Sequence, residues 1–439
     1  MSTAILVVDA TGRGHAICDL FARTHPGATV FYAGSNAIER DRIVPVEAIS
    51  LTDPRTALGF LLENSVEFTF VSNIDALSIG YVDVLRAHGH RVIGPTAAAA
   101  QLEASKERGK RFCTDHGIPT APYRAFTDPR AAKAYLRSLP YACVVKTDGL
   151  CKDGDGAVVC DTNAQAEAAV DGFAAQFGPA FRVVIEQRLY GTEISVFALL
   201  DGNGGYLPFP TALDFKRACD DDRGTNCDGM GSIAPHPAET PALRDEIRAV
   251  LLEPLVRGLR RDRLDYSGFV YVGAMMTAQG LRVIEINARF GDSEAEAVLP
   301  GVRSDFVRLC RVVLAGSLGG ETLETDGCVR CSVALTQGSL APFDPAAQPG
   351  WPFGAFAAGQ PIDGLGAPDT ADATVFYANV RRAAGVPVTC GGRVLHVVGR
   401  GTSLEQARDN AYGRIGRIAF DGMRYRSDIG AGALASSAR

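Results

Sequence analysis

Short apolar runs alternate with helical stretches along the first 95 residues of this 439-residue chain. Such alternation at this spacing is typical of a doubly wound α/β domain with a parallel sheet. In sheets of this kind, phosphate-binding loops lie at the carboxyl ends of the strands. The expected strands are Ala4–Val8, Thr29–Tyr32, Phe68–Val71 and Val92–Ile93, and the expected helices are His15–Thr24, Thr56–Asn64 and Ile79–His88.

The rest of the chain is expected to form three further α+β units. After Gly94-Pro95-Thr96, a single helix is expected from Ala98 to His116, where Gly117 and Pro119 end it. The expected elements that follow are strands at Ala142–Lys146, Ala157–Cys160 and Arg182–Gln187, helices at Asn163–Phe177 and near Pro241–Leu259, strands near Val329–Leu335, Thr374–Tyr377 and Val394–Val398, and a helix from Ser403 to about Phe420. These patterns predict domains over residues 1–120, 121–193, 194–325 and 326–439.

Charge and hydropathy argue against several classes of protein. The formal net charge is −6 and no block of basic residues appears, so the sequence does not favour binding to nucleic acid. No run of about 20 apolar residues is present, so no membrane span is expected, and the apolar start lacks a basic leader. The eleven cysteines, including the C-x-x-C pair Cys328 and Cys331, are expected to be free thiols in a reducing cytoplasm.

The stretch Val283–Arg289 shows the apolar–polar alternation of a strand. Glu285, Asn287 and Arg289 are expected to project from one face, because side chains alternate between faces along a strand. A carboxylate and an amide oxygen are hard ligands that suit Mg²⁺, and a neighbouring guanidinium neutralises a migrating phosphoryl group. An amphipathic strand with a solvated polar face would show the same alternation, so this stretch alone leaves both interpretations open.

Lysines beside glycine-rich segments indicate where a polyphosphate is held. Lys146 ends an expected strand immediately before a loop that contains Gly154 and Gly156, where backbone N–H groups can cover phosphates. Lys106 and Lys110, one helical turn apart, are candidates for a further phosphate contact. Taken singly, each of these lysines is equally compatible with an ordinary surface position.

The stretch that runs from Glu186 through Leu189 to Glu193 links two expected strands. A linker of this type can offer backbone hydrogen bonds to adenine and a carboxylate to ribose. An ordinary strand connection is the alternative interpretation.

A second glycine-rich segment follows a pair of charged residues. Asp214 and Lys216 precede a stretch that includes Asn226, Gly229 and Gly231. This pattern suits anion binding and loop closure, and it also suits a solvated turn.

In their order along the chain, these motifs resemble the ATP-grasp superfamily and, within it, glycinamide ribonucleotide synthetase, the phosphoribosylamine–glycine ligase of purine synthesis. The matching segments are Gly94–Lys106, Lys146–Leu150, Gly229–Gly231, Arg289–Asp292 and Gly391–Leu395. The resemblance extends from Val8 to Gly430. It implies a Rossmann-like N-terminal domain, an ATP-grasp core whose lid and central subdomains cover residues 121–193 and 194–325, and a C-terminal α+β domain.

The resemblance also implies roles for individual residues, with ATP between the lid and the central sheet. Lys106, Lys146, Gly154 and Gly156 would hold the phosphates; Glu186, Leu189 and Glu193 would line the adenosine; Glu285 and Asn287 would ligate Mg²⁺ or Mn²⁺; Arg289 would stabilise the transferred phosphoryl group; and Asp214, Lys216, Asn226 and Asp292 would surround the acid and the amine. On the acceptor side, the substrate-binding residues would be Gly12, Arg13, Asn36, Asp75, Gly229 and Gly231.

Departures from the family pattern lie mainly on the acceptor side. The family's first loop, Gly-Asn-Gly-Gly-Arg-Glu-His-Ala, here reads Asp-Ala-Thr-Gly-Arg-Gly-His-Ala, so that Asp9 and Thr11 replace two glycines. In the family's Gly-Pro-Glu-Ala-Pro-Leu motif, which contacts the sugar of phosphoribosylamine, the Glu is replaced by Ile74, with Asp75 adjacent. On the ATP side, Asp155 stands where the family has a lysine.

The resemblance implies an ADP-forming carboxylate–amine ligase that forms an amide through an acyl phosphate. The acceptor-side departures favour a paralogue that joins glycine or another amino acid to a different amine. The alternatives are an authentic glycinamide ribonucleotide synthetase and, more remotely, a nucleotide-binding regulator without catalysis; a dehydrogenase is disfavoured because Gly12-Arg13-Gly14 lacks a third glycine. The expected cofactors are ATP and Mg²⁺ or Mn²⁺, and the expected partners are a small-molecule acid and amine, in a cytoplasmic monomer or homodimer.

Overall fold

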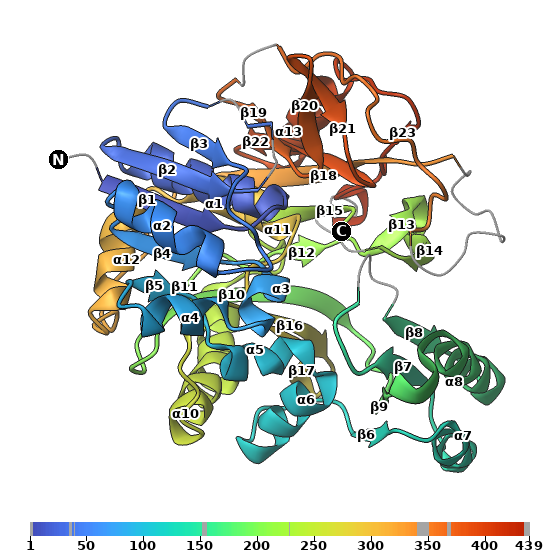
Figure 1. Cartoon of the computed structure of the whole chain (residues 1–439). Coiled ribbons are helices and arrows are strands. Elements are labelled where there is room, and N and C mark those ends of the chain that lie inside the picture. Colours follow the sequence, from blue (N-terminus) through green and yellow to red (C-terminus); the bar gives the residue numbers. More distant parts are fainter. Residues whose placement is uncertain are drawn as a thin grey trace.

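The computed structural model describes residues 3–34, 37–38, 40–151, 156–227, 229–339, 351–366 and 370–433. Four sheets of four or more strands make up most of the architecture, as Figure 1 shows. The N-terminal, central and C-terminal sheets lie together, while the small unit that follows α6 stands to one side of them. In the part of the chain that the structure describes, every helix is too short or too polar to cross a membrane.

The N-terminal domain contains a five-stranded sheet with the order β3-β2-β1-β4-β5, in which every pairing is parallel. The predicted doubly wound parallel sheet is therefore confirmed. The edge strand β3 was missed in the sequence, because Pro45 interrupts its apolar pattern; proline is tolerated at a sheet edge. The elements are β1 (Thr3–Val8), α1 (Gly12–Thr24), β2 (Ala28–Ala33), β3 (Ile43–Val46), α2 (Arg55–Glu63), β4 (Phe68–Val71), α3 (Ile74–Ser78), α4 (Tyr81–Ala87) and β5 (Val92–Ile93).

The helix predicted from Ala98 to His116 is two helices, α5 (Ala97–Ala104) and α6 (Lys106–Asp115). The prediction of one helix was wrong because Ser105 adopts an extended backbone conformation, with φ −128° and ψ 114°. Its side-chain oxygen accepts a hydrogen bond from the N–H of Arg108 and so caps α6. The break places Lys106 in the first turn of a helix.

The unit that follows α6, called the lid here after its predicted role, contains an antiparallel sheet with the order β6-β9-β7-β8 and has its own apolar core beneath two helices. Its helix α8 has the predicted bounds, because Thr162 and Gln165 form a capping box at its start. The elements are β6 (Tyr123–Phe126), α7 (Pro129–Ser138), β7 (Cys143–Thr147), β8 (Ala157–Cys160), α8 (Asn163–Phe177) and β9 (Val183–Gln187).

The central sheet has the order β11-β10-β16-β17 and is antiparallel. The long helix predicted near Pro241–Leu259 is present as two α-helical segments joined by a π-helical turn, Arg248–Leu252. The elements are β10 (Thr192–Asp201), β11 (Tyr206–Pro208), α9 (Pro241–Ile247), α10 (Glu253–Arg261), β16 (Ser267–Thr277), β17 (Gly280–Asn287), α11 (Glu294–Val298) and α12 (Phe306–Leu314).

The C-terminal sheet has the order β12-β15-β18-β22-β19, with β23 also paired to β18. Its strands β12 and β15 come from the middle of the chain, so this sheet joins segments that are distant in sequence. The last helix was predicted to reach about Phe420 but ends at Ile415, before Gly416. The elements are β12 (Leu213–Asp214), β15 (Gly231–Ala234), β18 (Val329–Gln337), β19 (Ala373–Tyr377), β22 (Arg393–Gly401), α13 (Leu404–Ile415) and β23 (Met423–Arg424), and two hairpins pair β13 (Arg217–Cys219) with β14 (Arg223–Asn226) and β20 (Val380–Ala383) with β21 (Val386–Thr389).

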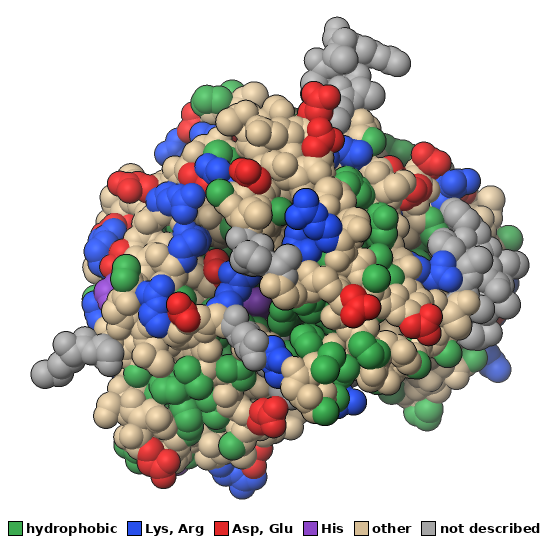
Figure 2. All heavy atoms as spheres, turned by 90° about the horizontal axis from the view of Figure 1, so that it is seen from above, with side chains coloured by type: hydrophobic (Ala, Val, Ile, Leu, Met, Phe, Trp, Pro, Cys, Tyr) green, Lys and Arg blue, Asp and Glu red, His purple; other side chains and the backbone are tan. Residues whose placement is uncertain are grey.

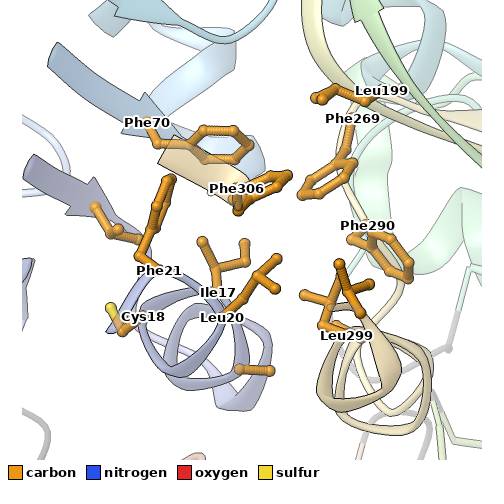
Figure 3. Packing of buried hydrophobic residues seen from close by; sticks show 14 of the residues in the cluster. Ile17, Cys18, Leu20, Phe21, Phe70, Leu199, Phe269, Phe290, Leu299 and Phe306 are labelled. Atoms are coloured by element: carbon orange, nitrogen blue, oxygen red, sulfur yellow. The ribbon is translucent and has the colours of Figure 1, made fainter. Parts of the chain in front are cut away.

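A core rich in phenylalanine joins the N-terminal domain to the central sheet, as Figure 3 shows. Phe290, in the turn after β17, stacks on Phe197 with ring centroids 4.1 Å apart. Phe269 stacks on Phe306 of α12, which also contacts Phe21 of α1. Burial of such rings stabilises the junction by roughly 2–3 kcal/mol each. This packing connects the turn after β17 to α1 through Phe269 and Phe306.

The surface carries both signs of charge. On the face drawn in Figure 2, basic and acidic side chains are interspersed, and no continuous basic field covers that view. All eleven cysteines are free, and eight of them are buried, which confirms the sequence-based prediction of free thiols.

Candidate nucleotide and acceptor site

A buried ion-pair triad lies at the base of the lid. Lys146 of β7 places its Nζ 2.6 Å from Oε1 of Glu186 on β9, while Lys110 of α6 contacts the other carboxylate oxygen. Lys110 also donates a hydrogen bond to Thr120 Oγ1 at 2.8 Å. All three charged side chains are buried. Burial alone would raise the pKa of Glu186, but the two ammonium groups lower it below its usual range.

Two ammonium groups and one carboxylate give this triad one net positive charge. The triad therefore attracts an anion to the lid. The sequence suggested a phosphate contact for Lys110 and an adenosine contact for Glu186. In the structure, each of these side chains is engaged by its partner in the triad. Their observed contacts therefore hold Lys146 in place at the end of its strand.

Glu285 lies on β17 among three lysines from different parts of the chain. Burial opposes its ionisation, but Lys216, Lys146 and Lys106 together lower the pKa of Glu285 to about 2. Gly273 is its partner on β16, and a Cβ added there would lie 3.2 Å from Glu285 Cγ. The glycine thus leaves room for a carboxylate that stays ionised at neutral pH.

Lys216 faces several acidic groups. Its Nζ lies 2.7 Å from Glu193 Oε2 at the start of β10. Burial lowers the pKa of Lys216, but Glu193, Glu285 and Asp214 outweigh it and raise the pKa well above its usual value. Lys216 is therefore fully protonated, and the structure brings together four of the residues that were singled out in the sequence.

Lys106 is held beside the loop that follows β7. Its Nζ donates to the carbonyl oxygen of Gly149 at 3.0 Å. In the same loop, Asp148 accepts hydrogen bonds from Ser105 Oγ and from the N–H of Glu107, which fixes the start of α6. The next residues include Gly154, which lies outside the described part of the chain. Gly156 is described, and its carbonyl oxygen accepts from the N–H of Thr147.

Arg289 was predicted to share a strand face with Glu285 and Asn287. Strand β17 contains those two residues but ends at Asn287, so Arg289 lies in the turn beyond it. Its Nη2 is 2.9 Å from Glu103 Oε1 of α5. The other Glu103 oxygen accepts from the N–H of Ala288 at 2.6 Å. Glu103 therefore orients both the turn and the guanidinium.

The acceptor side is organised at the start of α1. Asp9 Oδ2 lies 2.8 Å from Arg13 Nε, and both side chains are buried. Asp9 also accepts a hydrogen bond from the N–H of Thr11 at 3.0 Å. Asp292 Oδ1 accepts from the N–H of Arg13 at 3.2 Å. The helix N-terminus, which favours anions, thus has carboxylates of the protein itself bound to it.

The remaining acceptor-side residues are placed as follows. Gly229 has φ +57°, and a Cβ there would lie 2.2 Å from the carbonyl oxygen of Asp292, so glycine is required for this close approach. Gly231 begins β15, and Asn226 ends β14. Asp75 is exposed in the first turn of α3. Asn36 lies outside the described residues, and Leu189 lies half-buried between β9 and β10.

Three residues near the site were missed in the sequence. Glu103 was quoted only as part of a motif, yet a single charged side chain in an alanine-rich helix is a usable signal. Glu296 and His396 are fully buried beside Asp292. For His396, the available signal in the sequence was a lone histidine within the apolar run Val394–Val398.

The sequence matches the phosphoribosylglycinamide synthetase family over three stretches. Residues 3–103 match its N domain, residues 104–295 its ATP-grasp (A) domain, and residues 345–432 its C domain. A phosphoribosylamine–glycine ligase of Vibrio cholerae is 36% identical over 436 residues, with 98% of each chain covered. One of Escherichia coli O6:H1 is 38% identical over 432 residues, with 97% of each chain covered.

Solved structures show the same fold. The phosphoribosylamine–glycine ligase of Thermotoga maritima is similar with a TM-score of 0.77 and 28% identity, covering 97% of this chain and 100% of that chain. The biotin carboxylase domain of Hydrogenobacter thermophilus 2-oxoglutarate carboxylase, solved with MgADP, ADP and bicarbonate, has a TM-score of 0.71 at 17% identity and covers 96% of this chain and 91% of that chain. The second likeness bears on the fold alone.

Proposed function

Because this chain belongs to the phosphoribosylglycinamide synthetase family, we propose that it joins glycine to phosphoribosylamine and converts ATP to ADP and phosphate. The chain is an ATP-grasp ligase that forms a C–N bond. Its full-length relatives support phosphoribosylamine as the acceptor better than they support the divergent paralogue that the acceptor loops suggested. Family membership equally disfavours a regulator without catalysis. The cytoplasmic location and the monomeric or dimeric state remain predictions.

One observation carries the proposal: a carboxylate that is kept ionised by lysines from three segments of the chain. Glu285 is influenced by Lys106 of α6, Lys146 of the lid and Lys216 of the loop after β12. Lysines that converge on one carboxylate from a lid and a central sheet can bind a polyphosphate and its metal together. An isolated surface carboxylate would have no such set of neighbours.

The donor set fits Mg²⁺. Glu285 offers a charged oxygen, and the nearby Asn287 on the same strand offers an amide oxygen. Hard oxygen ligands of this kind suit Mg²⁺, which keeps waters and substrate phosphates in its other positions. When bound there, the ion would supply charge neutralisation between the ATP phosphates and the substrate carboxylate.

The residues of the chain have separable tasks in the reaction. A carboxylate is a poor electrophile, because its charge repels an amine, and transfer of a phosphoryl group to it creates a good leaving group. Lys146 and Lys106 bind the phosphates and reduce the repulsion between the two anions. Arg289, oriented by Glu103, stabilises charge on the transferred group. The lid excludes water from the acyl phosphate.

A second candidate acceptor is an amine that lacks a ribose phosphate. It is favoured by the buried pair of Asp9 and Arg13, in which a carboxylate neutralises the arginine at the start of α1. Ile74 adds to this, because its side chain cannot accept hydrogen bonds from ribose hydroxyls. An unpaired buried hydroxyl costs about 1–3 kcal/mol.

The test is ADP and phosphate release by the purified chain with glycine and phosphoribosylamine, the latter generated in the assay from ribose 5-phosphate and ammonia. We expect Mg²⁺-dependent ADP formation that requires all three substrates. Formation of AMP and pyrophosphate would exclude the proposed reaction class. If an amine that lacks a ribose phosphate gives a kcat/KM at least about 10-fold above that of phosphoribosylamine, which corresponds to about 1.4 kcal/mol, the second candidate is correct.

A further inference from the structure

Three ionisable side chains form a compact group at the edge of the acceptor side, which we call the Asp292 cluster; the proposed reaction gives no role to two of them, Glu296 and His396. Its members are Asp292 in the turn after β17, Glu296 on α11 and His396 on β22. His396 Nε2 lies 3.9 Å from Asp292 Oδ1 and 3.8 Å from Glu296 Oε1. One ligand atom from each of the three lies within 4.8 Å of the others.

Three polar atoms of this cluster are buried without a hydrogen-bond partner among the described residues. They are Glu296 Oε1 and both ring nitrogens of His396. Both side chains are fully buried, with 0% exposure. A buried polar atom left unpaired typically costs about 1–3 kcal/mol. Glu296 Oε1 and His396 Nε2 lie 3.8 Å apart, which is too far for a direct hydrogen bond between them.

The surrounding structure keeps the cluster in place from several sides. The other oxygen of Glu296 accepts from the N–H of Ser293 at 3.0 Å, which fixes its carboxylate. His396 lies in the middle of β22, paired on both sides by β18 and β19. At Gly12, a Cβ would lie 2.3 Å from Glu296 Oε1 and 2.9 Å from His396 Cδ2, so only glycine leaves this space open. Asp292 is the partly exposed member of the cluster, with 17% of its side chain exposed.

We propose that Asp292, Glu296 and His396 form a binding site for a divalent transition-metal ion, separate from the Mg²⁺ ligands Glu285 and Asn287. Two carboxylate oxygens and one imidazole nitrogen are a donor set that Zn²⁺, Co²⁺, Mn²⁺ and Fe²⁺ accept in proteins. Ligand atoms on a tetrahedral zinc lie about 3.4 Å apart. The observed separations of 3.8 and 3.9 Å thus require a contraction of only a few tenths of an ångström.

The protonation states of the cluster agree with this role. Burial lowers the pKa of His396 to about 4, so its imidazole is neutral at physiological pH, which is the form that binds metals. Burial and the neighbouring Asp292 raise the pKa of Glu296, so a metal ion must displace a proton from it. Arg393, with Nη1 3.4 Å from Asp292 Oδ2, weakens the attraction for a cation and limits the affinity.

The experiment measures binding of Zn²⁺ and Co²⁺ to the full-length chain, by dialysis with metal analysis and by the visible absorption of bound Co²⁺. We expect close to one equivalent of Zn²⁺ at this site, and His396→Ala should raise its dissociation constant by at least about 100-fold. Glu296→Gln, which preserves shape, should raise it by at least about 10-fold. His116→Ala is the matched control and should leave binding unchanged, because His116, directly after α6, pairs with Asp262, directly after α10.

Several outcomes would overturn the proposal. These are an absence of bound metal in the wild-type chain, equal binding by His396→Ala, and a cobalt spectrum with the charge-transfer band of cysteine thiolates. If His396→Ala does not fold, His396→Gln serves in its place. Glu285→Gln distinguishes this site from the Mg²⁺ site, since Zn²⁺ binding should survive in that variant. The outcome of this experiment does not depend on which amine is the acceptor.

Discussion

The two sides of the candidate site use opposite charge arrangements. On the nucleotide side, lysines converge on a single carboxylate, and Lys106, Lys146 and Lys216 all act on Glu285. On the acceptor side, carboxylates converge on the start of α1, where Asp9 pairs with Arg13. The first arrangement leaves net positive charge for a polyphosphate and a metal. The second leaves little positive charge for an acceptor phosphate. The nucleotide side therefore bears on the reaction class, and the acceptor side bears on the identity of the amine.

The contrast indicates that different residues of this chain bear on the reaction class and on the identity of the substrate. The lysines that surround Glu285 come from the lid, from α6 and from the loop after β12, which are separate parts of the fold. The acceptor side depends on a few loop residues.

The largest expected effect is on the nucleotide side. Glu285→Ala removes the charged ligand among the lysines and should lower kcat for ADP formation by about 100-fold or more, with every amine tested. Steady-state ADP release measures this, and Glu405→Ala in an exposed position of α13 is the control. A folded Glu285→Ala variant with near-normal turnover would show that β17 does not hold the metal.

The next effect tests whether Glu103 orients Arg289. Glu103→Gln keeps an oxygen for the N–H of Ala288 but removes the charge that holds the guanidinium. We expect kcat to fall by about 10-fold, with little change in KM for ATP, because small displacements of a catalytic group are costly. Glu107→Gln, which loosens an exposed pair with Arg182, should change kcat less than about 2-fold.

A smaller and more selective effect is expected on the acceptor side. Asp9→Asn leaves the charge of Arg13 uncompensated, so KM for an amine that carries a phosphate should fall by up to about 10-fold. KM for ribosylamine, which lacks the phosphate, should stay constant. Asp19→Asn on the same helix is the control, since Asp19 pairs with Arg23 and Arg40 instead. An equal change in KM for both amines would show that Asp9 does not act on the phosphate of the acceptor, and the proposed difference between the two sides would be wrong.

The sequence was informative where the structural signal is local. The bounds of α8 were predicted because its capping residues lie at its own start, and the alternation of apolar and polar residues correctly placed Glu285 and Asn287 on one strand. The break at Ser105 was missed, because good helix-forming residues flank it on both sides. The partnership of Glu103 with Arg289 was missed because the two residues are far apart in sequence and only the fold brings them together.

The grouping of Glu296 and His396 with Asp292 could not be predicted for a similar reason. These residues come from a turn, a short helix and a strand of the C-terminal sheet, and no spacing in the sequence links them. The placement of β12 and β15 in that sheet likewise depends on pairing with β18, about 100 residues further along the chain. Local periodicity predicts strands, but it does not predict which sheet a strand joins.

The smallest expected effect is a pH dependence of stability that comes from Glu285. Its pKa in the folded chain is about 2, below the ordinary value of 4.5. The ionised form is thus favoured by folding, so the stabilisation is complete above the unfolded-state pKa and is lost as the pH falls from about 4.5 toward 2. Between pH 7 and pH 4, the free energy of unfolding should fall by about 1 kcal/mol more in the wild-type chain than in Glu285→Gln, which cannot titrate at this position.

Urea unfolding at the two pH values measures the difference. An identical loss in both chains would mean that the lysines do not act on Glu285 and would remove the electrostatic basis for the nucleotide side.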